Sequence, residues 1–452
     1  MSVETDHAVE HHVAEPYPPA WRAWTVVAIL FVVTLLSQLD RQIPALLVAP
    51  IKAEFGISDT AFSLLQGYAF ALIYTLMGLP FGRLVDTTNR RNLIVGGVIV
   101  WSAMTALSAF SSSYSVLFIA RMGVGVGEAV LAPAAYSIIA DYVAPARRGR
   151  AISVYYLSLA IGQGASLLIG GLILKLIPPA GAQLPLVGLT EAWRIAFLIA
   201  GAPGIVLASL LFLVREPARR ETAAGGSGSA IPSLRDLFAF MRSNRGALWP
   251  IFLCPTALAV VGYAAVNWAV AFYERSFGLS PQQIGVTLGI VVASGGIMGT
   301  LFSGFLGDWL AARGVQAARL RVMQFSMLLT LAMAGIWTLM PTAGLSLAML
   351  GIMLFASVVG HSCAPVMVQE VVPNRMRGQI VSIYLLIAGL GGIALAPTAV
   401  ALITDYVFAD EAAVGRSLAI VGFPTALLGT IVAFASQRPY ATVGRRIAAA
   451  AA

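Results

Sequence analysis

Runs of apolar residues, each long enough to cross a membrane, alternate with short polar connections along nearly the whole chain. A helix that spans the hydrocarbon core of a bilayer needs about 20 predominantly apolar residues. Windows of this kind predict twelve spans, which fall into two groups of six. They lie near residues 22–50, 60–84, 93–112, 114–142, 149–177 and 192–214, and near residues 246–274, 282–307, 320–340, 343–369, 379–405 and 413–437.

The two groups of six spans repeat each other in sequence. Three segments of the first half recur in the second half, at offsets of 222, 222 and 229 residues. They are FGIS at 55–58 and FGLS at 277–280, GRLVD at 82–86 and GFLGD at 304–308, and the stretches 141–155 and 370–384. Ordered matches at near-constant spacing indicate a six-plus-six duplication, which is the architecture of many secondary transporters.

The composition places most of the chain in lipid. Hydrophobic residues make up 59% of the 452 residues and charged residues 11%, against about 25% charged residues in soluble domains. The net charge of +8 does not indicate a nucleic-acid partner, because the basic residues lie in short connections between apolar runs. One side of the membrane receives 21 Lys and Arg and the other side 5, and the richer side is expected to be cytoplasmic. We therefore predict an all-α membrane protein with two pseudo-symmetric six-helix domains and cytoplasmic termini.

The domain boundaries follow from the same pattern. We expect a disordered cytoplasmic tail, an N-terminal six-helix domain, a cytoplasmic linker, a C-terminal six-helix domain and a second cytoplasmic tail. These segments are residues 1–21, 22–214, 215–245, 246–437 and 438–452. Within the linker, residues 233–242 read as a short amphipathic helix on the membrane surface, and an unstructured tether is the alternative.

Charged residues interrupt two of the apolar spans. Asp40 and Arg41 lie in the middle of the first span, where each charge costs about 2.5–3.5 kcal/mol on insertion scales. The fourth span carries Arg121 and Glu128, seven residues apart and therefore on one face of a helix. Charges at this depth predict a proton or substrate site, and a buried ion pair that fixes helix register is the alternative.

Three motifs resemble the major facilitator superfamily. They are GRLVDTTNRR at 82–91, with a weaker copy that begins at 304, RMGVGVGEA at 121–129, and the pair Asp40-Arg41. The last two together are similar to the spinster branch, and the resemblance covers nearly the whole chain. It implies alternating access between two six-helix domains, driven by proton movement, with a lysolipid or sphingoid phosphate as cargo. A polyspecific proton-coupled drug antiporter and an organic-anion/proton symporter are the alternatives.

The resemblance also implies that the first and fourth helices adjoin, which would join the four charged residues into one network. Because arginine keeps its proton, the titrating members of the network are Asp40 and Glu128. We predict that Asp40 is the main proton carrier and that Glu128 is a second, coupled site. Arg41 and Arg121 would alternate between pairing with these acids and binding an anionic head group.

The second half of the chain carries no charge at the matching positions. Its polar and aromatic residues at membrane depth predict a substrate cavity. They are Tyr263, Asn267, Trp268 and His361. A charged half that faces a mostly apolar half suits an amphiphile with a polar head. The alternative is that these residues serve helix packing, and that His361 is a hydrogen-bonded core residue.

The repeated loop predicts a gate at the cytoplasmic side. We expect Asp86 to face the N-terminus of the eleventh helix near Arg377, where the helix dipole attracts a carboxylate. Asp141 would pair with Arg83 or Arg90, and Glu370 would pair with Arg313. Ordinary loop turns with arginines that set topology are the alternative. The full set of gate residues is Gly82, Arg83, Asp86, Arg90, Asp141, Asp308, Arg313 and Glu370.

No phosphate-binding loop, metal cluster or nucleophile triad is recognisable in the sequence, so we expect neither an enzyme nor a cofactor. The energy source would be a proton gradient. The expected partners are a small amphiphilic substrate, protons and membrane lipids, with no nucleic acid. We expect a multi-pass monomer in a bacterial inner membrane.

Overall fold

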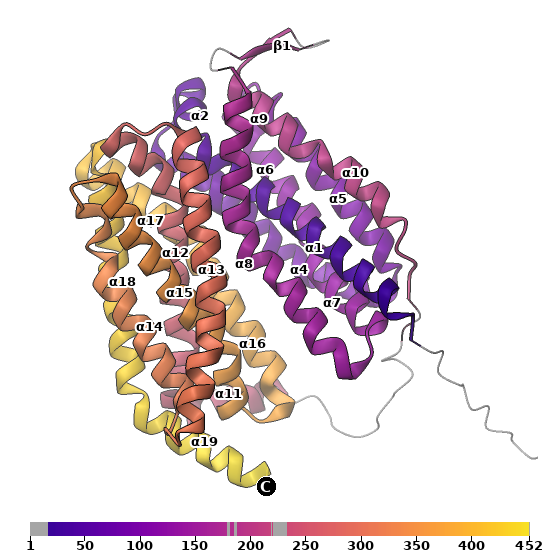
Figure 1. Cartoon of the computed structure of the whole chain (residues 1–452), viewed down its shortest axis with the longest axis vertical. Helices are drawn as coiled ribbons and strands as arrows, with labels where there is room; N and C mark the ends of the chain where they lie inside the picture. Colours follow the sequence, from indigo (N-terminus) through magenta and orange to yellow (C-terminus); the bar gives the residue numbers. More distant parts are fainter. Residues whose placement is uncertain (1–16, 179–180, 185–187, 218, 220–232, 452) are drawn as a thin grey trace, which may run out of the picture.

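The computed structural model describes residues 17–178, 181–184, 188–217, 219 and 233–451. This part of the chain contains twelve helical spans that are long and apolar enough to cross a membrane, as the hydrophobic pattern predicts. The spans form two bundles that stand side by side (Figure 1). We call them the first bundle, residues 20–211, and the second bundle, residues 245–435.

The first bundle contains six spans, and three of them consist of two α-helices in line. The spans are α1 (Ala20–Gln42), α3 with α4 (Asp59–Ser63 and Ala69–Thr87), α5 (Arg90–Ser108), α6 with α7 (Tyr114–Glu128 and Leu131–Tyr142), α8 (Pro145–Leu176), and α9 with α10 (Ala192–Gly201 and Pro203–Leu211). A 3₁₀ turn, η1 (Ile43–Leu46), extends α1, and a π-helical turn, η2 (Leu64–Tyr68), joins α3 to α4.

The second bundle repeats this order. Its spans are α12 (Arg245–Phe277), α13 (Pro281–Ala312), α14 (Ala318–Ala334), α15 (Ala343–Val371), α16 with α17 (Asn374–Gly389 and Ala396–Leu402), and α18 (Val414–Ala435). The π-helical turn η4 (Leu390–Leu395) joins α16 to α17, and η5 (Ile403–Phe408) ends that span. Two short 3₁₀ turns, η3 (Trp337–Leu339) and η6 (Glu411–Ala413), lie in the connections.

The sequence repeat is reproduced in hydrogen bonds. At the offset of 229, Arg148 Nη2 donates to the carbonyl of Ala140 at 2.7 Å, and Arg377 Nη2 donates to the carbonyl of Gln369 at 2.8 Å. At the offset of 222, Ser58 and Ser280 each accept a backbone N–H and cap the helix that follows. Matching residues therefore hold matching helix ends, as expected of a duplicated bundle.

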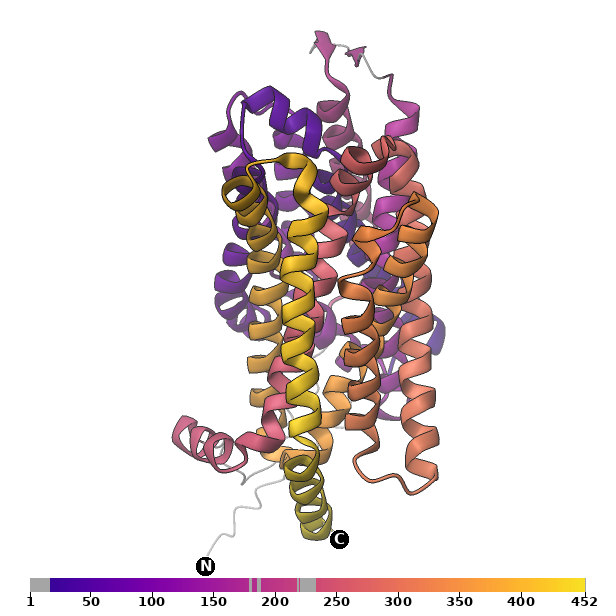
Figure 2. The same ribbon diagram turned by 90° about the vertical axis from the view of Figure 1, so that its left-hand side faces the viewer.

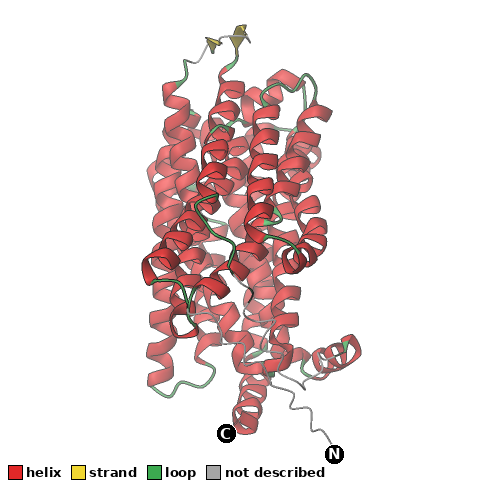
Figure 3. Ribbon diagram, turned by 90° about the vertical axis from the view of Figure 1, so that its right-hand side faces the viewer, coloured by secondary structure: helices red, strands yellow, loops and turns green. Residues whose placement is uncertain are grey.

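The elements outside the spans mark the two ends of the molecule. The short antiparallel hairpin of β1 (Ala182–Leu184) and β2 (Gly188–Thr190) follows α8, and it is a small departure from the expected all-α fold (Figure 3). We call this the hairpin end, and α2 (Val48–Phe55) lies near it. The amphipathic helices α11 (Leu234–Ser243) and α19 (Gln437–Ala451) lie at the opposite end (Figure 2). We call that end the terminal end.

These helices differ in part from the expected tails and linker. Residues 1–16 of the tail expected at 1–21 lie outside the described residues, and α1 begins at Ala20. The amphipathic stretch expected at 233–242 forms α11, whose N-terminus is capped by the Ser233 hydroxyl. Most of the tail expected at 438–452 belongs to α19, which packs by Tyr440 and Val443 against the second bundle.

The two bundles approach most closely toward the hairpin end. Helices α8 and α13 lie side by side there and diverge toward the terminal end (Figure 1). Glycine permits this approach, because a Cβ added at Gly164 would lie 2.3 Å from the backbone nitrogen of Ala293. Two turns further along α8, a Cβ at Gly171 would lie 2.8 Å from the nitrogen of Val286. The conformation is therefore closed at the hairpin end.

Candidate functional site

The four charged residues of the first and fourth spans lie together inside the first bundle. Arg41 Nε donates to Glu128 Oε2 at 2.5 Å, and Arg121 Nη2 donates to the backbone carbonyl of Asp40 at 2.9 Å. The side chains of Asp40, Arg121 and Glu128 are buried. Helices α1 and α6 thus bring together a network of two acids and two bases, as the sequence and the family resemblance predict.

The carboxyl group of Asp40 is the least satisfied member of this network. Its residue is 0% exposed, and neither carboxyl oxygen has a hydrogen-bond partner among the described residues. The indole N–H of Trp101 and the hydroxyl of Thr105, both on α5, are close enough to interact with this carboxyl group. They too lack a hydrogen bond of good geometry within the described chain. The site therefore holds an acid in a buried setting with donors poised beside it.

Arg41 faces the second bundle. Its guanidinium lies 4.4 Å from the ring centre of Phe70 and 4.9 Å from that of Tyr74, distances typical of cation–π contacts. The phenol of Tyr263, on α12 of the second bundle, is close enough to interact with it electrostatically. The side chain of Arg41 is 22% exposed, whereas that of its partner Glu128 is 0% exposed. Arg41 is therefore the member of the network that a solute between the bundles would reach first.

The four residues expected to line a cavity are divided between different environments. Asn267 accepts a hydrogen bond from Gln66 Nε2 of the first bundle at 2.7 Å, so Tyr263 and Asn267 both lie at the contact between the bundles. Trp268 is 1% exposed and donates its indole N–H to the carbonyl of Pro397. In this conformation Trp268 is thus buried and does not line an open cavity.

His361 lies apart from the other three. It interacts with the backbone of Pro255, on α12. Pro255 and Asn267 are twelve residues apart, which corresponds to roughly 18 Å along a helix. The structure therefore favours the alternative for His361, a hydrogen-bonded residue of the second bundle.

Arg90 organises the gate segment of the first bundle. It donates to Asp141, to Ser137 Oγ at 2.8 Å and to Glu216 Oε1 at 2.7 Å, and it is 1% exposed. Of the two partners expected for Asp141, the structure thus selects Arg90. Gly82, Arg83 and Asp86 lie on the same segment, with Arg83 and Asp86 exposed. The hydrogen bonds of Arg90 stay within the first bundle and the segment that follows it.

The gate segment of the second bundle differs from the expected pairing. Asp308 accepts a hydrogen bond from Arg319 Nη2 at 2.5 Å, and the guanidinium of Arg313 stacks 3.8 Å from the ring centre of Trp309. Glu370 accepts instead from the hydroxyl of Tyr440, on α19, at 2.7 Å. The expected pair of Glu370 with Arg313 is absent from the hydrogen bonds and ion pairs of these two described residues, because Arg313 is held on Trp309 and Glu370 by α19.

An ion cluster that the sequence analysis did not anticipate joins the bundles at the hairpin end. Lys52 and Arg275 both pair with Asp59 and with Glu411, at distances from 2.5 to 3.1 Å. Asp59 is 0% exposed. We call Lys52, Asp59, Arg275 and Glu411 the hairpin-end cluster. The sequence did contain a sign of this cluster, because Lys52 and Arg275 lie near the two copies of the repeated FG motif. These two charges contributed only to the prediction of membrane topology.

Comparisons with known proteins agree with this architecture. Residues 30–397 match the sequence profile of the Major Facilitator Superfamily. The chain is 32% identical over 321 residues to an MFS-type efflux pump of Mycolicibacterium smegmatis, which covers 69% of this chain and 67% of that protein. It is 30% identical over 266 residues to protein spinster homolog 3 of Danio rerio, covering 58% of this chain and 49% of that protein.

A solved structure shares the whole fold. It is a bacterial homologue of the human lysosomal transporter spinster in an inward-facing and unoccupied conformation, with a TM-score of 0.76 and 24% identity. The match covers 96% of this chain and 99% of that one. The chain spans about half the length of the spinster homologue from Danio rerio.

The chain belongs to the Major Facilitator Superfamily. It is a multi-pass integral membrane protein, and it is similar in sequence to spinster homologues and in fold to a bacterial spinster homologue.

Proposed function

We propose that this protein is a proton-coupled carrier of amphiphiles with an anionic head, such as a lysolipid or a sphingoid phosphate. The observation that carries the proposal is the buried carboxyl group of Asp40, which has no hydrogen bond within the described chain and lies beside Arg121 and the pair of Arg41 with Glu128. Charges at membrane depth usually belong to proton relays or substrate paths.

The charge balance of the network suggests how protons and cargo are linked. An ionised carboxylate without a hydrogen bond in such a buried setting would cost several kcal/mol, so we infer that Asp40 holds a proton in this conformation. The remaining charges are then two arginines and one glutamate, an excess of one positive charge. An anionic head group that pairs with Arg41 or Arg121 would remove that excess, and loss of the Asp40 proton would do the same. Anion binding and proton loss are thus alternative ways to neutralise the network, so a bound proton favours binding of the anion and the two events are coupled.

The structure is closed at the hairpin end, so in this conformation the carrier opens toward the terminal end. The bundles are joined at the hairpin end by the hairpin-end cluster and by Thr60, whose N–H and hydroxyl both donate to Asp405 at 2.6 Å. Because the terminal end carries most of the arginines, we assign it to the cytoplasm of a bacterium. The conformation is then open inward, and the cycle needs no cofactor besides the proton gradient. One pair of bundles contains the whole network, so we expect a monomer to be sufficient.

Transport in proteoliposomes tests the proposal. A pH-sensitive dye trapped inside reports proton flux when lysophosphatidylglycerol or sphingosine phosphate is added outside. We expect flux with the wild type and none with Asp40→Asn, which preserves shape but cannot exchange the proton. Asp236→Asn, on the surface helix α11, makes the same chemical change outside the network and should retain the flux. Undiminished proton flux in Asp40→Asn would disprove the assignment.

A drug exporter is the second candidate, because one relative with 32% identity is named an MFS-type efflux pump. The same vesicles distinguish the two by the charge of the cargo. Flux on a lipophilic cation such as ethidium, with none on the anionic amphiphiles, would favour drug efflux. Flux on a short organic anion alone would favour an organic-anion symporter.

A further inference from the structure

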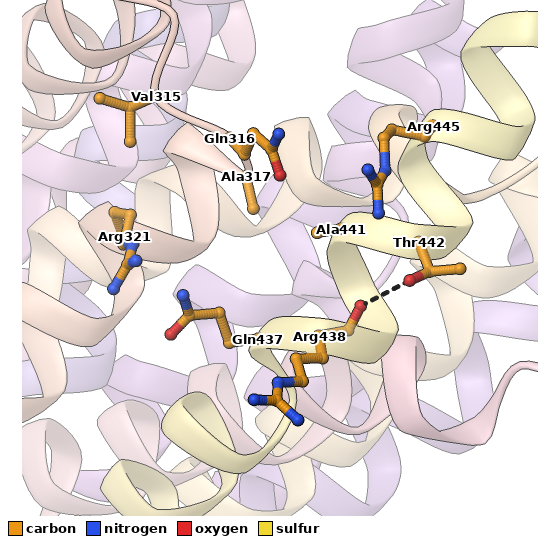
Figure 4. Close-up of a pocket in the computed structure, with 9 residues that line it drawn as sticks. All are labelled: Val315, Gln316, Ala317, Arg321, Gln437, Arg438, Ala441, Thr442 and Arg445. Atoms are coloured by element: carbon orange, nitrogen blue, oxygen red, sulfur yellow. Dashed lines mark hydrogen bonds between the residues drawn. The ribbon is translucent and has the colours of Figure 1, made fainter.

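A basic pocket lies at the terminal end of the second bundle, away from the four-charge network. Its volume is about 410 Å³. The connection between α13 and α14 forms one wall, and α19 forms the other (Figure 4). The nine described residues that line it include three arginines and no Asp or Glu. The arginines are Arg321 of α14, and Arg438 and Arg445 of α19.

The position of α19 explains why two of these arginines share the pocket. Arg438 and Arg445 are seven residues apart and lie on one face of the helix. The other face is buried, with Tyr440 at 1% and Val443 at 6% exposure. The hydroxyl of Tyr440 donates to Glu370 Oε2 at 2.7 Å, and burial beside this carboxylate raises the pKa of Tyr440 well above its usual value. The phenol therefore stays a donor, and α19 is fixed with its basic face toward the pocket.

The electrostatics of the pocket favour an anion. Arg321 donates to the neutral amide oxygen of Gln324 at 3.2 Å, and none of the three arginines forms an ion pair with a described acidic residue. The amides of Gln316 and Gln437 provide further donors at the walls (Figure 4). Ala317, the N-cap of α14, borders the pocket and provides no side-chain cap for the first N–H groups of that helix. Free N–H groups at a helix N-terminus attract anions.

The backbone at Ala317 is consistent with a site that is built for a ligand. Its φ of 55° lies in the left-handed region, which residues other than glycine seldom adopt. Strain of this kind gathers at ligand sites when the surrounding structure holds it in place. The left-handed backbone at Ala317 turns the connection between α13 and α14, and Gln316 and Arg321 line the same pocket.

The surroundings of the pocket distinguish a lipid from a free ion. One turn from Arg321 along α14, Phe325 and then Leu328 are exposed, at 39% and 47%. On α18, which packs against α14, Ile431 and Phe434 are exposed at 57% and 43%, just before Gln437. The basic pocket thus continues into an apolar surface on two spans that faces the hydrocarbon. A molecule with a phosphate at one end and acyl chains at the other fits both parts.

We propose that this pocket binds the phosphate of an anionic phospholipid, with the acyl chains along the surface of α14 and α18. The proposal is independent of the transported cargo. It assigns the site to the leaflet at the terminal end, which is the cytoplasmic leaflet if the topology proposed above holds. Basic pockets at this level of other membrane proteins bind anionic head groups. A bound lipid would also fix α19 to α14.

Lipid binding by the purified full-length protein tests the proposal. Native mass spectrometry and thermal unfolding would be recorded in detergent with added phosphatidylglycerol, phosphatidylcholine or inorganic phosphate. We expect phosphatidylglycerol to be retained and to raise the unfolding temperature, phosphatidylcholine to do so much less, and phosphate alone to have no effect at the same concentration. In Arg438→Gln/Arg445→Gln, binding of phosphatidylglycerol should weaken by about fivefold for each arginine lost.

Two controls make the outcome decisive. Arg235→Gln/Arg242→Gln removes two charges from the other surface helix, α11, and should bind phosphatidylglycerol as the wild type does. Asp40→Asn should also bind it normally, which separates this site from the transport network. Arg321→Gln, on α14, tests the pocket from its other wall if the double variant in α19 does not fold. Equal losses in the α11 control, equal protection by phosphatidylcholine, or full competition by inorganic phosphate would overturn the proposal.

Discussion

At the scale of single residues, substitutions of Arg41 and Glu128 distinguish a role of this pair in stability from a role in transport. Glu128 is 0% exposed at its side chain and accepts from Arg41 at 2.5 Å. Breaking a buried pair by removing one partner typically destabilises a protein by about 3–5 kcal/mol. We expect Glu128→Gln to lose stability of that order, measured by thermal unfolding in detergent, and to lose transport as well.

The double variant Arg41→Gln/Glu128→Gln separates the two effects. It removes both charges of the pair, so neither partner is left unpaired, and we expect it to recover much of the lost stability without recovering proton-coupled transport. Recovery of both properties would mean that the pair only fixes the register of α1 against α6. Recovery of neither would mean that the neutral side chains do not pack in this site.

The sequence could predict the charged members of the site but not their neutral neighbours. Asp40, Arg41 and Arg121 were identified because a charge in an apolar span demands an explanation. Trp101 and Thr105 carry no such signal, since both are ordinary residues of a membrane helix. Their closeness to Asp40 depends on how α5 packs against α1, and this packing cannot be deduced from a single sequence. His361 is the opposite case. It was predicted to line the cavity because it is polar and lies at membrane depth, but it interacts with the backbone of Pro255 within its own bundle.

At the scale of helices, the contact of α8 with α13 depends on the absence of a side chain at Gly164. A Cβ there would lie 2.3 Å from a backbone nitrogen of α13, which cannot move aside. We expect Gly164→Ala to disfavour the conformation closed at the hairpin end. Spin labels at Ala53→Cys and Ala412→Cys, in a chain with Cys254 and Cys363 replaced by serine, would then report a longer distance across that end.

Gly162→Ala is the matched control for this change. It lies one half-turn away on α8, and its new Cβ would lie 2.8 Å from Cγ of Gln38, so the crowding it causes falls within the first bundle and not between the bundles. The label distance should therefore stay as in the parent. An unchanged distance in Gly164→Ala would show that α8 and α13 can separate slightly without opening the hairpin end.

Helix lengths and ends were largely predictable, whereas interruptions within spans were not. The apolar pattern identified the twelve spans, and repeated serine caps such as Ser58 and Ser280 match the repeated motifs. The break between α6 and α7 directly after Glu128 lies four residues before Pro133, which has no N–H to bond the carbonyl of Ala129 and therefore interrupts the helix there. The hydropathy of the fourth span is continuous across this break, so the apolar pattern did not reveal it.

At the scale of the whole molecule, we expect the two ends of the bundles to close alternately, so that one end is open while the other is closed. The hairpin-end cluster joins the bundles here, while Asp86 of the gate segment is exposed. The helix that Asp86 is expected to face, α16, begins at Asn374 without a side-chain cap, so its first N–H groups are available. A carboxylate at such a helix end contributes about 0.3–1 kcal/mol. Weakening one end should therefore favour closure of the other.

Arg275→Ala removes one of the two cations that link Asp59 to Glu411, and we expect it to favour closure of the terminal end. Disulfide cross-linking between Thr87→Cys and Asn374→Cys, in the same chain with Cys254 and Cys363 replaced by serine, should become faster in this background. Adding Asp86→Asn should remove part of the gain, by up to about fivefold, because the attraction to the α16 dipole is lost. Adding Asp236→Asn on α11 should not. If Arg275→Ala leaves the cross-linking rate unchanged, the cluster does not hold the hairpin end closed. If Asp86→Asn has no effect while Arg275→Ala accelerates the reaction, the bundles do rock, and the terminal end closes through contacts other than the expected latch.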